Sequence, residues 1–327
     1  MTSAAIDKIP PQPLPKAYHI LPESIDFIIP GFRSFYTPGD KTLALRQRDC
    51  EEWFNEFVDK LLAACGKYYL PVCRMSDGEF LFLLGYQPPN LRLSLKERAK
   101  QRINRFLQRL YCGWRFNAYT AGSGLFYSSG EYSYLEWQKA KKPYTDWLKK
   151  ISEQGILALH LNYGRIPFQE YYFPALGRWM DRHSIKLTDY NYVPFYFVYA
   201  ALTGPRRTDL LKGRRVLVVN SAEGEKHRQV EDGLRKEGIA KIFWHPISRM
   251  RSLYDRIDVT PFIGKVDLAV VGAGIGKPNI MIQLEPLQVP CIDAGFVFEV
   301  WANPENKRKR AVCAPDEEWK ERKENNP

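Results

Sequence analysis

The chain has 327 residues, of which 45% are hydrophobic, 26% charged and 14% aromatic. This composition excludes disordered and fibrous proteins, and the length allows one large or two ordinary globular domains. The formal net charge of +11 would suit nucleic acid, an anionic membrane surface or a phosphorylated ligand, so charge alone does not select a partner.

Cysteine usage, together with the lack of an apolar segment of signal-peptide or membrane-helix length, predicts a cytoplasmic protein. The six cysteines form no CxxC pair, and several lie in apolar runs, where cysteine acts as a small hydrophobic residue. The first residues lack the continuous apolar core of a signal peptide. No apolar stretch approaches the roughly 20 residues of a membrane helix. Peripheral membrane association through basic patches stays open.

The first part of the chain predicts an arm followed by a domain. Residues 1–40 are rich in proline and turn formers, which indicates an extended arm. Residues 41–64 have helical spacing of apolar side chains, and residues 69–74 read as a strand. We expect one domain over residues 41–303 and a charged tail over residues 304–327.

The middle of the chain alternates between expected helices, one strand and one loop. Helical patterns cover residues 95–110, 141–153, 168–183 and 192–202. Residues 119–133 are rich in Gly, Ser and Tyr, which is typical of a functional loop. Residues 155–161 form an apolar run that predicts a buried strand.

The last third of the chain shows the clearest alternation. Apolar runs predict strands over residues 214–220, 241–245, 266–271 and 290–293, with helices over residues 226–237, around Arg251 and up to Leu287. Alternating strands and helices predict an α/β fold with a Rossmann-like, mostly parallel sheet flanked by helices. Ligands of such sheets bind at the carboxyl ends of the strands.

The segment Arg74-Met-Ser-Asp77-Gly78-Glu79 follows the first expected strand of the domain. Two carboxylates separated by a flexible glycine could bind one hard divalent cation, Mn²⁺ or Mg²⁺, next to a phosphate. The alternative is a helix start, because Ser76-x-x-Glu79 before an apolar run is a capping box. The two interpretations are compatible.

A glycine-rich loop follows the expected strand at 266–271. It contains Gly272, Ala273, Gly274 and Gly276, and Lys277 comes next. Glycines let backbone amides approach an anion, and the start of the following helix favours phosphate. The spacing matches neither GxGxxG nor a P-loop, so a tight structural turn is the equal alternative.

Two other strands also end in polar groups. Asn220, Ser221 and Glu223 follow the strand at 214–220, and Asp293 closes the strand at 290–293. Each group alone could be a cap or a turn. Because the carboxyl ends of parallel strands share one edge, together they predict a pocket for a phosphorylated ligand.

The order of these motifs resembles the glycosyltransferases of the GT-D fold, a family first described as a domain of unknown function. The residues that carry the resemblance are the 74–79 segment, the strand and glycine turn at 267–274, and the Ile-Asp-x-Gly segment at 292–295. The resemblance spans residues 65–303. Ser76 stands where the family usually has Gly, and Phe296 stands where a His is common.

The resemblance implies a metal-dependent glycosyltransferase that uses a nucleotide diphosphate sugar, a UDP-sugar in particular. The family's Asp-x-Glu motif transfers to Asp77 and Glu79 as the metal and catalytic site, with Mn²⁺ or Mg²⁺. The acceptor would be a hydroxyl of a glycan or glycoprotein, and the domain over residues 41–303 would be catalytic. Glu223 and Asp293 are the candidate bases.

The remaining candidate residues are expected to line the donor site. Arg74 and Lys277 would assist the diphosphate, with Ser76 and Gly78 beside the acidic pair. The other lining residues are Asn220, Ser221, Glu223, Gly272, Ala273, Gly274 and Asp293.

Two other classes of protein compete with the transferase. A Rossmann-type dinucleotide enzyme would bind a nicotinamide or flavin cofactor, but the early GxGxxG is missing. A basic nucleic-acid-binding module would bind oligonucleotides with strong salt dependence, but no nucleic-acid motif is present, so no nucleic-acid partner is expected.

Overall fold

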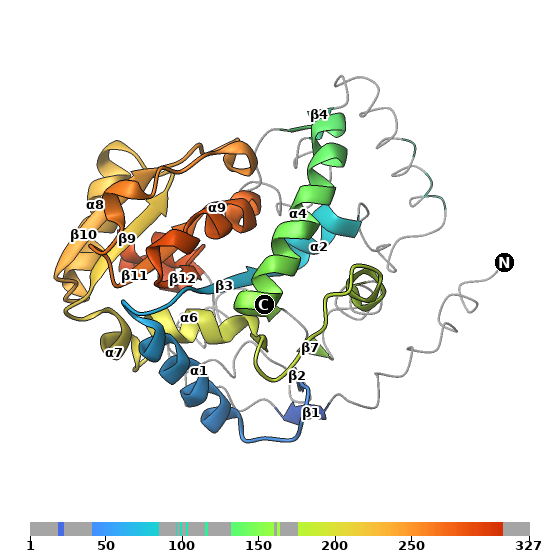
Figure 1. Ribbon diagram of the computed structural model, residues 1–327, viewed down its shortest axis with the longest axis horizontal. Coiled ribbons are helices and arrows are strands. Elements are labelled where there is room, and N and C mark those ends of the chain that lie inside the picture. Colours follow the sequence, from blue (N-terminus) through green and yellow to red (C-terminus); the bar gives the residue numbers. More distant parts are fainter. Residues whose placement is uncertain are drawn as a thin grey trace.

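The computed structural model describes residues 19–22, 41–84, 132–159, 162–163 and 176–309, together with residues 96, 99, 103, 115 and 116. Its centre is a seven-stranded sheet with the order β10-β9-β11-β12-β3-β6-β8, in which every neighbouring pair is parallel (Figure 1). Helices flank this sheet, so the expected α/β fold class is confirmed.

The strands of the large sheet come from the whole described length after residue 69. They are β3 (Leu70–Met75), β6 (Ile156–Leu159), β8 (Tyr192–Pro194), β9 (Arg215–Asn220), β10 (Lys241–Pro246), β11 (Leu268–Gly272) and β12 (Pro290–Asp293). A three-stranded sheet contains β1 (His19–Pro22), β2 (Lys41–Ala44) and β7 (Asn162–Tyr163), and β4 (Arg115–Phe116) pairs with β5 (Tyr132–Ser133).

The α-helices are α1 (Cys50–Ala64), α2 (Asp77–Leu84), α4 (Tyr134–Gln154), α6 (Phe195–Thr203), α7 (Arg207–Leu211), α8 (Gly224–Lys236), α9 (Lys277–Gln283) and α10 (Val297–Ala302). Short 3₁₀ turns are η6 (Ser252–Tyr254), η7 (Thr260–Phe262), η8 (Gly274–Gly276), η9 (Glu285–Leu287) and η10 (Pro304–Lys309). None of the described helices has both the length and the apolar character that a bilayer span requires.

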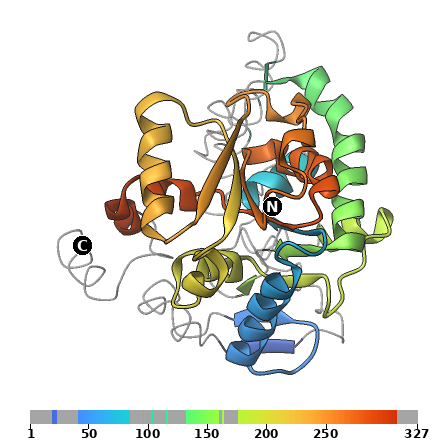
Figure 2. The same ribbon diagram turned by 60° about the vertical axis from the view of Figure 1, so that its left-hand side comes forward.

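Helices cover both faces of the large sheet. The long helix α4 packs on α9 at one face, and α8 packs on α10 at the other; Figure 2 shows α4 and α8 on opposite sides of the strands. Because both faces are covered, every residue of β3, β6 and β12 is buried, and all of them except Arg74 and Asp293 are apolar. The edge strand β10 is half-exposed.

The helix predicted over residues 41–64 is wrong at its beginning. Residues 41–44 form β2, which pairs with β1 and β7, and the helix starts at Cys50. Asp49 is its N-cap, and the Asp49 side chain accepts a hydrogen bond from the Glu52 amide at 2.9 Å. Pairing with distant strands outweighs the local helical spacing of Leu43 and Leu45.

Three further predictions differ from the structure. The segment 192–202 was expected to be helical throughout, but it starts with the edge strand β8, which pairs with β6 before α6 begins. The helix expected around Arg251 is the short turn η6, and the helix expected up to Leu287 ends at Gln283.

Several predictions lie outside the described residues. Most of the expected helix at 95–110 and of the loop at 119–133, the start of the helix at 168–183, and the tail from residue 310 belong to this group. Within the expected arm, residues 19–22 form β1.

Candidate functional site at the carboxyl edge of the sheet

Four neighbouring strands end in the polar and glycine residues that the sequence singles out. In the order β9-β11-β12-β3, the register pairs Asn220 with Gly272 and Val271 with Asp293. Across the next pair of strands, Arg74 Nε donates to the backbone oxygen of Asp293 at 2.7 Å. The structure therefore brings together groups up to 219 residues apart in the chain.

Arg74 ties β3 to β12 from inside the protein. Its side chain is buried, and Nη2 lies 3.0 Å from Asp293 Oδ1. The rings of Tyr199 and Phe195 cover its guanidinium, with centroids 4.4 and 5.1 Å from Cζ. These two contacts fit cation–π interactions in a desolvated site.

Both members of this pair are charged. Burial alone would lower the pKa of Arg74, but Asp293 and the Tyr199 hydroxyl outweigh it, so that pKa is raised. Burial alone would raise the pKa of Asp293, but Arg74 and Lys277 outweigh it, and the pKa of Asp293 is lowered. A carboxylate held in this way is a poor proton acceptor, which argues against Asp293 as the base.

Glu79 and Lys277 form the second half of the same charged cluster. The Lys277 ammonium lies 2.7 Å from Glu79 Oε1 and 3.0 Å from Asp293 Oδ2. The other oxygen of Glu79, Oε2, accepts a hydrogen bond from the Ser76 amide at 2.8 Å. The Phe80 amide donates to the Ser76 carbonyl at 2.9 Å, so Glu79 completes half of a capping box at the start of α2.

The described side chains do not fit a divalent cation as they stand. Both oxygens of Glu79 have partners, and the charges of Arg74, Lys277, Glu79 and Asp293 sum to zero. In the part of the chain that the structure describes, no three His, Cys, Asp or Glu side chains gather closely enough to hold a metal ion. The side chain of Asp77 lies outside the described part, so the prediction that Asp77 binds metal is untested.

Gly295 allows this cluster to close. Its φ is +46°, and a Cβ at this position would overlap the guanidinium of Arg74. Glycine is therefore needed here for two reasons. It adopts the left-handed backbone conformation easily, and it leaves room for the buried side chain of Arg74.

The polar ends of β9 and β11 are linked to each other. The Asn220 amide nitrogen donates to the Gly272 carbonyl at 3.3 Å, and its Oδ1 accepts from the Ala222 amide at 2.8 Å. A Cβ on Gly272 would overlap Asn220 and Phe298. Close packing therefore explains why residue 272 is a glycine. This agrees with the alternative that the loop is a tight structural turn.

Other predicted residues at this edge are accessible to a ligand. Ser76, Gly78, Ser221 and Gly274 are partly exposed, and Glu223, the residue before α8, is exposed. Ala273 is buried in the loop between β11 and α9.

Three aromatic residues next to the cluster were missed by the sequence reasoning. Tyr199 and Phe195 cover Arg74, and Tyr144 of α4 is fully buried. Burial raises the pKa of Tyr144 well above its ordinary value, and Glu79, Cys73 and Asp293 raise it further, so the hydroxyl lies near the cluster. The aromatic run at 192–202 was a signal, but its contact with Arg74 depends on the tertiary fold.

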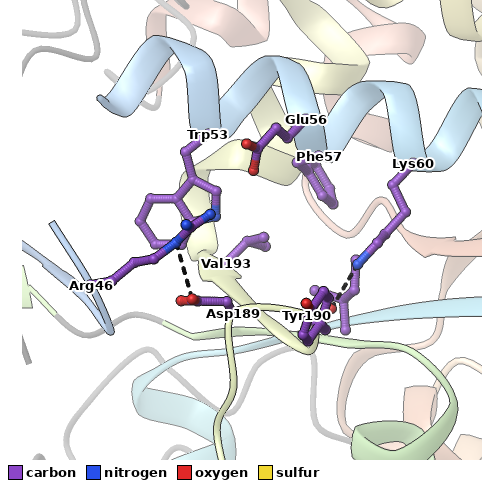
Figure 3. Close-up of a pocket in the computed structure, with 9 residues that line it drawn as sticks. Arg46, Trp53, Glu56, Phe57, Lys60, Asp189, Tyr190 and Val193 are labelled. Carbon is purple, nitrogen blue, oxygen red and sulfur yellow. Dashed lines mark hydrogen bonds and ion pairs between the residues drawn. The ribbon is translucent and has the colours of Figure 1, made fainter. Parts of the chain in front are cut away.

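A separate cavity of about 240 Å³ lies beside α1, away from this edge. Figure 3 shows that Glu56 and Lys60 reach it from α1, and that Asp189 and Tyr190 reach it from the segment before β8. Its charged groups are paired with each other or with neighbours: Arg46 with Asp189 at 3.0 Å, and Glu56 with Arg48. Lys60 Nζ donates to the Tyr190 carbonyl at 2.9 Å.

The chain is a parallel α/β protein whose polar groups gather where the strands end, which is the edge at which ligands of such sheets bind. No protein-family model and no curated protein matches the chain. A solved structure described as the selenomethionine-substituted domain of unknown function 1792 (DUF1792) aligns with a TM-score of 0.41 and 16% identity. The alignment covers 76% of this chain and 85% of that chain.

Proposed function

We propose that the chain is a glycosyltransferase that transfers a sugar from a nucleotide diphosphate donor, a UDP-sugar in particular, to a hydroxyl of a glycan or glycoprotein. The observation that carries the proposal is the meeting of four polar or glycine-rich strand ends at one sheet edge. The resemblance of their order to the GT-D glycosyltransferases supports the same reaction.

The accessible residues of the edge suit the diphosphate of such a donor. Within the loop at 272–276 Gly274 is partly exposed, and the residues at the start of α8 are exposed; their backbone amides would favour phosphate oxygens. Glu223 is exposed at the start of α8, and we propose it as the base that receives the proton of the acceptor hydroxyl if the reaction inverts.

The metal ion that the resemblance implies stays a prediction that depends on Asp77. The buried cluster of Arg74, Lys277, Glu79 and Asp293 orients the strand ends. A cytoplasmic location is part of the proposal; Cys65, Cys73 and Cys291 are buried thiols, as reducing conditions favour.

The proposal predicts that nucleotide diphosphates stabilise the protein. A ligand at about 100 times its dissociation constant adds about 2.7 kcal/mol to the free energy of unfolding. A thermal-shift panel of nucleoside diphosphates, nucleotide sugars and nicotinamide dinucleotides, with and without Mn²⁺, measures this effect. A shift with UDP and a UDP-sugar is expected.

Two variants sharpen the panel. Asp77→Asn is expected to remove any Mn²⁺-dependent part of the UDP effect, whereas Glu51→Gln on the exposed surface of α1 leaves it unchanged. A shift with nicotinamide dinucleotides alone would favour the dinucleotide enzyme and overturn the proposal, as would the absence of a shift with every nucleoside diphosphate.

A further inference from the structure

The ammonium of Lys277 lies between two carboxylates that come from different elements. Glu79 belongs to α2, Asp293 closes β12, and Lys277 begins α9. The ammonium is 2.7 Å from one carboxylate and 3.0 Å from the other, and 6% of its side chain is exposed. A divalent cation held by these same two oxygens would have to occupy the place of the ammonium.

The charge balance of the cluster favours the lysine over an added metal ion. Arg74 and Lys277 carry two positive charges, and Glu79 and Asp293 carry two negative charges, all on buried side chains. A divalent cation added to this balanced set would leave buried charge without a partner, which is costly.

We propose that the Lys277 ammonium takes the place of a metal ion beside the Asp-Gly-Glu motif. Glu79 is then a positioning residue: it holds Lys277 and does not ligate a metal ion in the free protein. This assignment departs from the one that the motif resemblance implies for Glu79. It concerns the protein without nucleotide, so it does not depend on the proposed glycosyl transfer.

Through Lys277, Glu79 also positions the glycine loop at 272–276. Lys277 directly follows Gly276, so the hold on its ammonium fixes the end of the loop at 272–276. The capping hydrogen bond to the Ser76 amide fixes the start of α2 through the same carboxylate. Glu79 thereby sets the distance between the two segments that the sequence singles out.

Binding of Mn²⁺ alone, followed by electron paramagnetic resonance, tests the proposal on the full chain. Wild type and Glu79→Gln are expected to bind Mn²⁺ with equal affinity, because Glu79 is not a ligand. Lys277→Met removes the ammonium and leaves the carboxylates of Glu79 and Asp293 close together without a cation between them. This variant is expected to bind Mn²⁺ at least about tenfold more tightly than wild type, and Mn²⁺ should raise its melting temperature.

Two controls separate this site from a general effect of charge. The double variant Glu79→Gln/Lys277→Met should lose the added affinity. Lys150→Met also frees a carboxylate, that of Glu285 at 2.6 Å, but this pair is partly exposed and involves no second carboxylate of the cluster. It should therefore bind Mn²⁺ no better than wild type.

Either of two results would overturn the proposal. One is an affinity of wild type for Mn²⁺ that falls about tenfold in Glu79→Gln, because Glu79 would then be a ligand. The other is a folded Lys277→Met protein that binds no additional Mn²⁺. If Lys277→Met does not fold, the comparison of wild type with Glu79→Gln still decides. None of these measurements uses a nucleotide, so they succeed or fail independently of the proposed function.

Discussion

Asp293 is the residue on which the carboxyl edge depends most. Its two carboxylate oxygens lie 3.0 Å from Arg74 and 3.0 Å from Lys277, and its backbone oxygen accepts from Arg74 as well. Its side chain is 2% exposed, so water cannot replace either partner. Removal of one charge from a buried pair leaves the other uncompensated, which costs far more than the loss of a surface pair.

Asp293→Asn is therefore expected to lower the free energy of unfolding by about 3–5 kcal/mol. Asp146→Asn is the matched control, because Asp146 is also paired with a lysine, at 3.1 Å, but is exposed; it should cost less than about 1 kcal/mol. Denaturant unfolding of the two variants beside wild type measures the difference. Equal losses of unfolding free energy in the two variants would show that Asp293 is not part of a buried charged cluster.

The lowered pKa of Asp293 predicts how the stability of the protein depends on pH. Because the pKa of Asp293 is lower in the folded protein than the value of about 3.9 in an unfolded chain, its stabilisation is present above that value. It is lost as pH falls through the lower folded pKa. Acid titration of unfolding should show a steeper loss below about pH 4 in wild type than in Asp293→Asn. Parallel curves would contradict the prediction.

At the scale of elements, the packing of α8 on α10 holds the loops of the site in place. The helix α8 follows Glu223, and α10 follows Gly295, so both begin at the carboxyl edge. Where the two helices touch, a Cβ on Gly233 would overlap the backbone carbonyl of Trp301. Glycine is tolerated in the middle of α8 because the close approach compensates for its poor helix propensity.

Gly233→Ala is expected to destabilise the protein by about 1–3 kcal/mol through overpacking, even though alanine favours the helix. Gly177→Ala is the control, since Gly177 is helical and nothing lies within 4 Å of an added Cβ. That variant should be stabilised by about 0.5–1 kcal/mol. Thermal unfolding compares the two; a stabilising Gly233→Ala would show that the helices do not touch as described.

At the scale of the whole molecule, the net charge of +11 predicts long-range attraction to polyanions. Such attraction is screened by salt and does not depend on the nucleotide sequence of the polyanion. It therefore differs from the binding of a small donor in a pocket, where a few directed contacts decide affinity.

Oligonucleotide binding is expected to weaken at least about tenfold between roughly 50 and 200 mM salt, and two unrelated sequences should bind equally. The UDP-induced thermal shift should change far less over the same range. Fluorescence anisotropy and thermal shift give the two readouts. Tight binding of one sequence at high salt would favour the nucleic-acid module in place of the transferase.

The sequence by itself determined the strands of the last third of the chain and the parallel α/β class. The strands β9, β11 and β12 are predictable because a strand covered on both faces needs a continuous apolar run, a signal that lies within each segment. The half-exposed edge strand β10 still carries a shorter apolar run, residues 242–244. The capping box of Ser76 and Glu79 is equally local, because its partners are three residues apart. These features required no knowledge of distant residues.

The tertiary structure alone decided which segments meet. The edge strand β8 and the early strand β2 are short, and they exist because a partner strand from elsewhere pairs with them. The bond between Arg74 and Asp293 and the hold of Glu79 on Lys277 join residues about 200 positions apart. Hydrophobic periodicity reports the face that a segment buries, whereas the order of strands and the pairing of buried charges depend on how the whole chain closes its core.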